Sequence, residues 1–183
     1  MCSFLVRRLS PAVFNCHMES LNAHRYWVYA RSWGFHLLVR IKCAEDIIPF
    51  YEEIKQKPFD PLVTDLSDFI MERFSNWLNG YTKAFNKMYR RKGALFMDYL
   101  RRSHAKNDAD FAHFVFYVHK NAVHHGLTKA IGEWEWDGYK TLLSDLPTQL
   151  LREELLGFFE GKEALVKYHQ RTIELKVEDW VDI

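Results

Sequence analysis

Cysteine is scarce in this sequence, and the three that occur, Cys2, Cys16 and Cys43, are not spaced like the ligands of a metal. An odd number of cysteines also fits poorly with a framework of disulfide bonds. The pattern argues against a disulfide-rich secreted domain and predicts free thiols in a reducing compartment.

A large net charge of either sign is also lacking, because 25 Lys and Arg nearly balance 24 Asp and Glu and leave a formal net charge of +1. No field of the whole molecule therefore points to nucleic acid, and such a function would depend on a local patch. No apolar run approaches the roughly 20 residues that cross a bilayer. In the opening segment MCSFLVRRLSP the arginines follow an apolar run too short for a signal peptide. We expect a soluble, cytoplasmic protein with no membrane partner.

Apolar and aromatic residues are plentiful, at 48% and 16% of 183 residues, which is typical of a globular domain. Residues 26–32 and 35–42 are rich in aromatic and branched side chains and predict two strands. A charged amphipathic segment follows at 44–57, and then a long helix that ends in a basic turn before Gly93. Strands followed by several helices favour an α+β fold.

The stretch FAHFVFYVHKNAVHHG at 111–126 predicts a further helix, capped by Asn107 or Asp108 and closed by Gly126. A helix has 3.6 residues per turn, so apolar residues three or four positions apart form one stripe, which is the expected core face. His119 lies off this stripe and is expected at the surface. A second stripe places Tyr117 one turn before Asn121, so that both polar ends can enter the same space. Tyr117 is then either a packed aromatic residue or a nucleophile, and spacing alone leaves both open. The expected core stripe comprises Phe111, Val115, Val118 and Ala122.

One dense basic region lies at the end of the long helix and just beyond it, and aromatic residues are interleaved with it. Its cations would track phosphates, and its aromatic rings could stack on unpaired bases. The cations are Lys83, Lys87, Arg90, Arg91, Lys92, Arg101 and Arg102, and the aromatic residues are Tyr81, Tyr89 and Phe96.

Several separated motifs, in a fixed order, give the chain a family resemblance. The upstream run FSNWLNGYTKAFNKMYRRKGALF at 74–96 is followed by YVHKNAVHHGLTKAIGEWEWDGY at 117–139. The second run resembles the single-tyrosine HUH transposases, and is most similar to the REP-associated branch, with its pattern Tyr-x-x-x-Asn-Pro-Val, then Gly-Leu, then Trp-x-Trp-Ser-Ser-Tyr. The matching positions are Tyr117, Asn121, Val123, Gly126, Leu127, Trp134, Trp136 and Tyr139.

This resemblance implies a ferredoxin-like antiparallel sheet of four strands with helices on one face, plus an added helical C-terminal tail. It implies binding of single-stranded or hairpin DNA, and cleavage and rejoining through a 5′-phosphotyrosine on Tyr117. His36 and Asn121 would hold a divalent metal ion, Mg²⁺ or Mn²⁺, and the basic region would hold the strand. Relatives of this kind act as monomers or as helix-swapped homodimers, and the sequence leaves both open.

Two departures from the family pattern affect these expectations. The family carries two histidines two residues apart on a strand, whose side chains therefore share one face. Here Gly34 stands in the place of the first and His36 in the place of the second. Residues 1–33 match the family poorly, so the expected organisation is an atypical segment at 1–33, a transposase-like domain at 34–145 and a helical tail at 146–183. The alternatives are a non-catalytic DNA-binding remnant and a protein-interaction domain without a DNA role.

Overall fold

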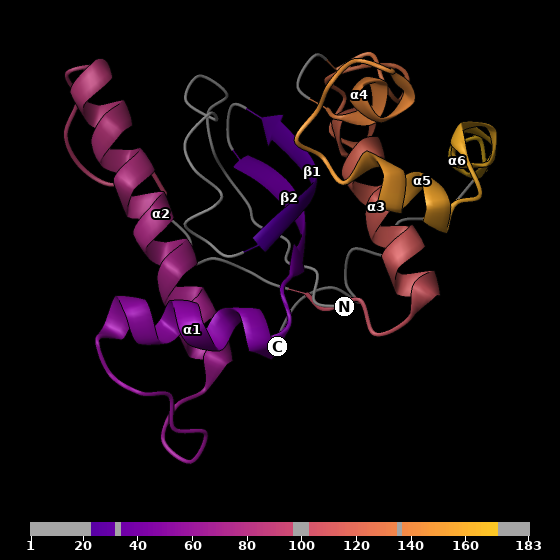
Figure 1. Cartoon of the computed structure of the whole chain (residues 1–183). Coiled ribbons are helices and arrows are strands. Elements are labelled where there is room, and N and C mark those ends of the chain that lie inside the picture. The colour runs from indigo at the N-terminus through magenta and orange to yellow at the C-terminus, as the bar shows by residue number, and fades with distance from the viewer. Residues whose placement is uncertain (1–22, 32–33, 97–102, 135–136, 172–183) are drawn as a thin grey trace. The chain divides into compact units, whose positions relative to one another are not determined.

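The computed structural model describes residues 23–31, 34–96, 103–134 and 137–171, and these fall into two compact units (Figure 1). Residues 25–40 and 103–171 form the first, here called the tyrosine unit. Residues 41–96 belong to the second, here called the α1–α2 unit. Arg101, Arg102, Trp136 and most of the atypical segment at 1–33 lie outside the described residues.

Two strands, β1 (Ala23–Arg31) and β2 (Gly34–Ile41), pair in a two-stranded sheet. The expected ferredoxin-like sheet of four strands is wrong, because the described residues contain only these two strands and are otherwise mainly helical. After β2 the apolar residues recur at helical spacing, and strands need the alternating spacing instead. The segment 94–96, which follows the long helix, is irregular.

The α1–α2 unit is built on α1 (Ala44–Lys55) and α2 (Leu66–Met88). Asp65 caps α2, since its side chain accepts a hydrogen bond from the backbone N–H of Ser67 at 2.7 Å. Aromatic rings join the two helices, with the rings of Tyr51 and Phe69 5.1 Å apart in an edge-on arrangement. The 23-residue α2 therefore packs against the 12-residue α1 through aromatic side chains.

The end of α2 differs from the expected stop at Gly93. Arg90 already adopts a left-handed backbone conformation, with φ of 49°, directly after the helix. The N–H of Arg91 then reaches back to the carbonyl of Asn86 at 3.0 Å, which satisfies a carbonyl that the helix leaves open. Asn86 Nδ2 also donates to the carbonyl of Gly93 at 2.9 Å, so the basic turn is held against the helix end.

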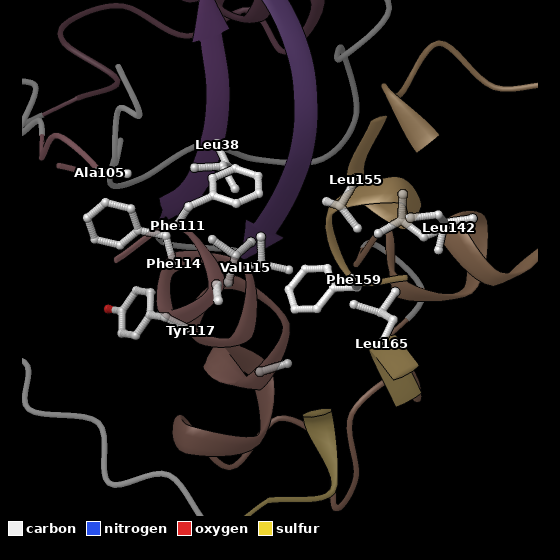
Figure 2. Packing of buried hydrophobic residues seen from close by; sticks show 14 residues of the cluster. Leu38, Ala105, Phe111, Phe114, Val115, Tyr117, Leu142, Leu155, Phe159 and Leu165 are labelled. Carbon is white, nitrogen blue, oxygen red and sulfur yellow. The ribbon is translucent and has the colours of Figure 1, made fainter. Parts of the chain in front are cut away.

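The tyrosine unit contains β2 and four helices, α3 (Asp108–His124), α4 (Tyr139–Leu143), α5 (Arg152–Phe158) and α6 (Lys162–His169). The hydroxyl of Thr148 accepts from the N–H of Leu150 in a turn, and α5 begins two residues later at Arg152. Each of these elements supplies a buried aliphatic residue to one cluster with α3 (Figure 2). These residues are Leu38, Leu142, Leu155 and Leu165.

Candidate functional site

Local chemistry defines both ends of α3, the helix that carries Tyr117. Asn107 caps its start, because Oδ1 accepts from the N–H of Asp110 at 2.9 Å, as one of the two expected caps. Gly126 ends it with φ of 68°, and the N–H of Leu127 bonds the carbonyl of Ala122 at 2.9 Å. This six-to-one bond around a left-handed glycine confirms the predicted stop.

The expected core stripe of α3 is confirmed, because Phe111, Val115, Val118 and Ala122 are all buried. Burial extends much further, however, since β2 covers one side of the helix and α4–α6 cover another. A helix that is apolar nearly all round must be covered nearly all round. Most of the circumference of α3 is therefore removed from solvent, and the side that carries His113 and Lys120 stays partly exposed.

His36, Tyr117 and Asn121 are the residues that the resemblance assigned to catalysis and metal binding, and all three are buried. The rings of His36 and Tyr117 meet edge-on, with centroids 5.3 Å apart and planes at 89°. Tyr117 is 4% exposed, and Figure 2 shows its hydroxyl end pointing away from the other labelled side chains of the cluster. The Tyr117 ring is thus packed against the core cluster and against the ring of His36.

Asn121 follows Tyr117 by one turn of α3, and its side chain is fully buried. Within the described residues, neither Oδ1 nor Nδ2 of Asn121 has a hydrogen-bond partner. A buried amide without partners costs about 1–3 kcal/mol, so a water, an ion or a ligand that hydrogen-bonds Asn121 would stabilise the folded chain. Asn121 is the feature of this site that most favours a bound group.

The donors present fall short of a metal site. His36 and Asn121 offer one imidazole and one amide, and Gly34 has no side chain to supply the third ligand of the family pattern. No group of three or more His, Cys, Asp or Glu that could hold a metal ion occurs among the residues with described side chains. A divalent ion bound by two neutral donors would lack the carboxylates or further imidazoles that usually hold it.

The second polar cluster of the tyrosine unit was not predicted. His119 was expected at the surface, but it is fully buried and its Nδ1 contacts Nε2 of His169 on α6. Nδ1 of His169 lies 2.8 Å from the carbonyl of Leu165 and donates to it. The Nε2 of a neutral His169 then accepts, so His119 donates from Nδ1. Nothing in the local spacing could reveal this pair, because its members lie 50 residues apart.

Aromatic rings surround this histidine pair. The ring of Tyr139 lies 5.1 Å from both imidazoles, and the ring of Phe116 lies 5.6 Å from that of His169. Burial lowers the pKa of both histidines, that of His169 to about 4, so both rings are neutral near pH 7. The pair therefore connects α3 to α6 as two hydrogen-bonded neutral rings.

The aromatic turn before α4 packs Trp134 and Tyr139 against the core cluster. Asp137 stands where the family has serine, and its carboxylate accepts from the N–H groups of Gly132 at 3.2 Å and Tyr139 at 3.1 Å. Burial raises the pKa of Asp137 to about 6, although these two hydrogen bonds oppose the shift. This substitution thus organises the turn that positions Tyr139.

The basic surface belongs to the α1–α2 unit and comprises Lys83, Lys87, Arg90, Arg91 and Lys92 at the end of α2. All five side chains are exposed, and none is ion-paired within the part of the chain that the structure describes.

An aromatic row accompanies the basic surface. The rings of Tyr81 and Phe85 are 6.2 Å apart, and those of Phe85 and Tyr89 are 4.4 Å apart. The guanidinium of Arg91 lies 5.7 Å from the centre of the Phe85 ring. Cations and aromatic rings therefore alternate along one helix end.

Among the helices within the described residues, none combines the length and the apolar character that a membrane span requires. Comparison of the chain with protein-family models, with curated proteins and with solved structures finds no match.

Proposed function

We propose that this chain binds single-stranded or hairpin DNA through the basic surface at the end of α2. The observation that carries the proposal is the charge of residues 73–96, which contain six Lys and Arg and no Asp or Glu. Free cations can replace the counterions of a phosphate backbone, and the neighbouring rings offer stacking surfaces for unpaired bases. The resemblance to single-tyrosine transposases supports the same ligand.

Exchanging Lys83, Lys87 and Lys92 together for glutamine is the direct test of this surface. Each cation that contacts a phosphate releases a counterion, so the slope of log affinity against log salt should become shallower by about 2 for a single strand. Affinity at low salt should fall on the order of tenfold or more. Titration of a fluorescent hairpin oligonucleotide across several salt concentrations measures both quantities.

The matched control removes the same charge from exposed lysines of the tyrosine unit, namely Lys106, Lys129 and Lys167. This variant should bind DNA with the slope of the parent chain. An equal loss in both variants would show that only net charge matters. No salt-dependent binding by the parent chain would favour a protein-interaction domain without a DNA role.

A second candidate function is strand cleavage by Tyr117, whose ring contacts that of His36. The buried amide of Asn121, one turn further along α3, favours it, because this amide has no hydrogen-bond partner among the residues that the structure describes. In such a step the Tyr117 oxygen bonds to the scissile phosphorus, the bond from phosphorus to the 3′ oxygen breaks, and that oxygen takes up a proton. Because Tyr117 is buried, the strand could reach it only after a local opening of the tyrosine unit.

Covalent capture distinguishes cleavage from binding alone. The parent chain, Tyr117→Phe and Gly34→His are each incubated with hairpin DNA and Mn²⁺, and a denaturing gel then shows any covalent adduct. An adduct of the parent chain that Tyr117→Phe lacks establishes the nucleophile. An adduct of Gly34→His alone indicates that only the missing histidine prevents the reaction. Salt-dependent binding without any adduct identifies a non-catalytic DNA-binding protein.

A further inference from the structure

A stripe of exposed residues runs along α2, opposite the buried residues Ile70, Phe74 and Tyr81. Its members follow one another at helical spacing, so they share one broad face of the helix. Most of them are small or polar, and the buried Phe69, which packs against Tyr51 of α1, lies beside the stripe in the first turn of α2. The stripe consists of Asp68, Glu72, Ser75, Asn76, Asn79, Gly80, Lys83, Ala84 and Lys87.

The charges of this stripe are separated by sign and placed symmetrically. Asp68 and Glu72 lie in its first half, and Lys83 and Lys87 in its second half. Both sets are arranged about the midpoint between residues 77 and 78. Asp68 lies as far before this midpoint as Lys87 lies after it, and Glu72 lies as far before it as Lys83 lies after it. A helix of this design is complementary to itself when it is turned end to end, because each acid then faces a lysine.

The centre of the stripe is made for close approach. Gly80 is exposed in mid-helix, and a Cβ added there would meet nothing within 4 Å. Glycine at such a position costs about 1 kcal/mol relative to alanine, and no contact among the described residues accounts for it. Small residues at a helix surface allow a second backbone to come near. In the turned arrangement Gly80 lies opposite Ser75, and Asn76 lies opposite Asn79.

Apolar side chains lie exposed at both ends of α2. Leu62 and Val63, in the turn before the helix, are 93% and 80% exposed, and Met88 and Tyr89, at its end, are 59% and 52% exposed. An antiparallel pairing brings the first end of one copy to the second end of the other. Burial of these residues would supply the free energy that exposed ion pairs, worth at most about 1 kcal/mol each, do not.

We propose that the stripe on α2 binds the same stripe of a second copy of this chain, in an antiparallel pair with two-fold symmetry. Such a contact is isologous, so each interaction occurs twice. The free energy that one weak ion pair contributes to the interface is therefore doubled. Glu72 also binds Lys55 within its own chain at 2.6 Å, and it keeps 45% of its side chain exposed for the second copy. The inference does not depend on DNA binding, and it is tested without nucleic acid.

Two charge-reversed chains give the test, measured by sedimentation velocity over a range of concentrations. Lys83→Glu with Lys87→Glu makes the stripe entirely acidic, and Asp68→Lys with Glu72→Lys makes it entirely basic. Each variant alone should sediment as a monomer, while the parent chain and an equal mixture of the two variants should sediment as dimers. The mixture serves as the control for folding, because a misfolded variant could not restore pairing with its counterpart.

Gly80→Leu provides a second, independent variant. Leucine favours the helix more than glycine does, so the fold should stay intact while the close approach is blocked. We expect dimerisation to weaken at least tenfold. A monomeric parent chain at every concentration would overturn the proposal, and so would dimers that both single-sign variants retain.

Discussion

Replacement of Phe116 with alanine is expected to lower the free energy of unfolding by about 3–5 kcal/mol. Phe116 is 1% exposed, and its ring packs against Tyr168 and His169 of α6, with centroids 6.2 and 5.6 Å away. Its loss leaves a cavity between α3 and α6, and the surrounding rings cannot collapse into it without moving the histidine pair. Urea unfolding followed by circular dichroism measures the change.

Phe158→Ala is the matched control for this truncation. Phe158 is only half-buried, although its ring contacts that of Phe111 at 4.8 Å. Because part of the Phe158 ring is already exposed to water and a smaller apolar area is lost, the expected cost is about 1–2 kcal/mol. Equal costs for the two truncations would mean that α6 contributes little to the burial of α3.

The sequence contained more information about α3 than a single stripe. Residues 111–118 are apolar at all but one position, and this continuous run signals a helix covered on all sides. Analysis by periodicity selects the best face and assigns the rest to the surface. That assumption placed His119 in solvent, whereas the structure buries it against His169.

Partners distant in sequence explain what could not be predicted. The contact of His36 with Tyr117 follows from the family resemblance and from no local rule, and the pairing of His119 with His169 follows from neither. The end of α2 shows a different limit. Glycine is the usual residue for a left-handed stop, yet Arg90 takes that conformation because Asn86 and Arg91 hold the turn by hydrogen bonds.

The failure of the four-stranded expectation has a physical origin as well. A family motif identifies residues around a site, but a sheet needs alternating apolar segments that can pair. Beyond β2 the described residues offer helical periodicity, as in α2 and α3. The family resemblance, which rests on the order of the motifs, and the four-stranded ferredoxin-like sheet were therefore separate predictions. The structure contradicts the sheet and does not test the resemblance.

Acid is expected to destabilise the tyrosine unit through His169. The folded pKa of about 4 lies below the value near 6.5 of an unfolded histidine, so the unfolded chain binds the proton first as the pH falls. The stability that His169 contributes is thus present above about pH 6.5 and is lost between about pH 6.5 and 4. Linkage gives about 2 kcal/mol of loss between pH 7 and pH 5, and about 3 kcal/mol over the whole interval.

Two neighbouring groups also titrate in this range, and they act in opposite directions. Burial and the adjacent His169 lower the pKa of His119, so it adds to the loss in acid. Asp137 has a folded pKa of about 6, above its usual value, so its protonation stabilises the folded chain as the pH falls below 6. The pH dependence of the parent chain alone therefore cannot isolate His169.

The difference between matched variants does isolate it. His169→Gln keeps a polar side chain but does not titrate, and His104→Gln removes an exposed histidine as the control. Between pH 7 and pH 5, the parent chain and His104→Gln should lose about 2 kcal/mol more of unfolding free energy than His169→Gln does. If all three respond alike in urea titrations at the two pH values, His169 is not held neutral. The surrounding aromatic rings would then stabilise its cationic form instead of excluding it.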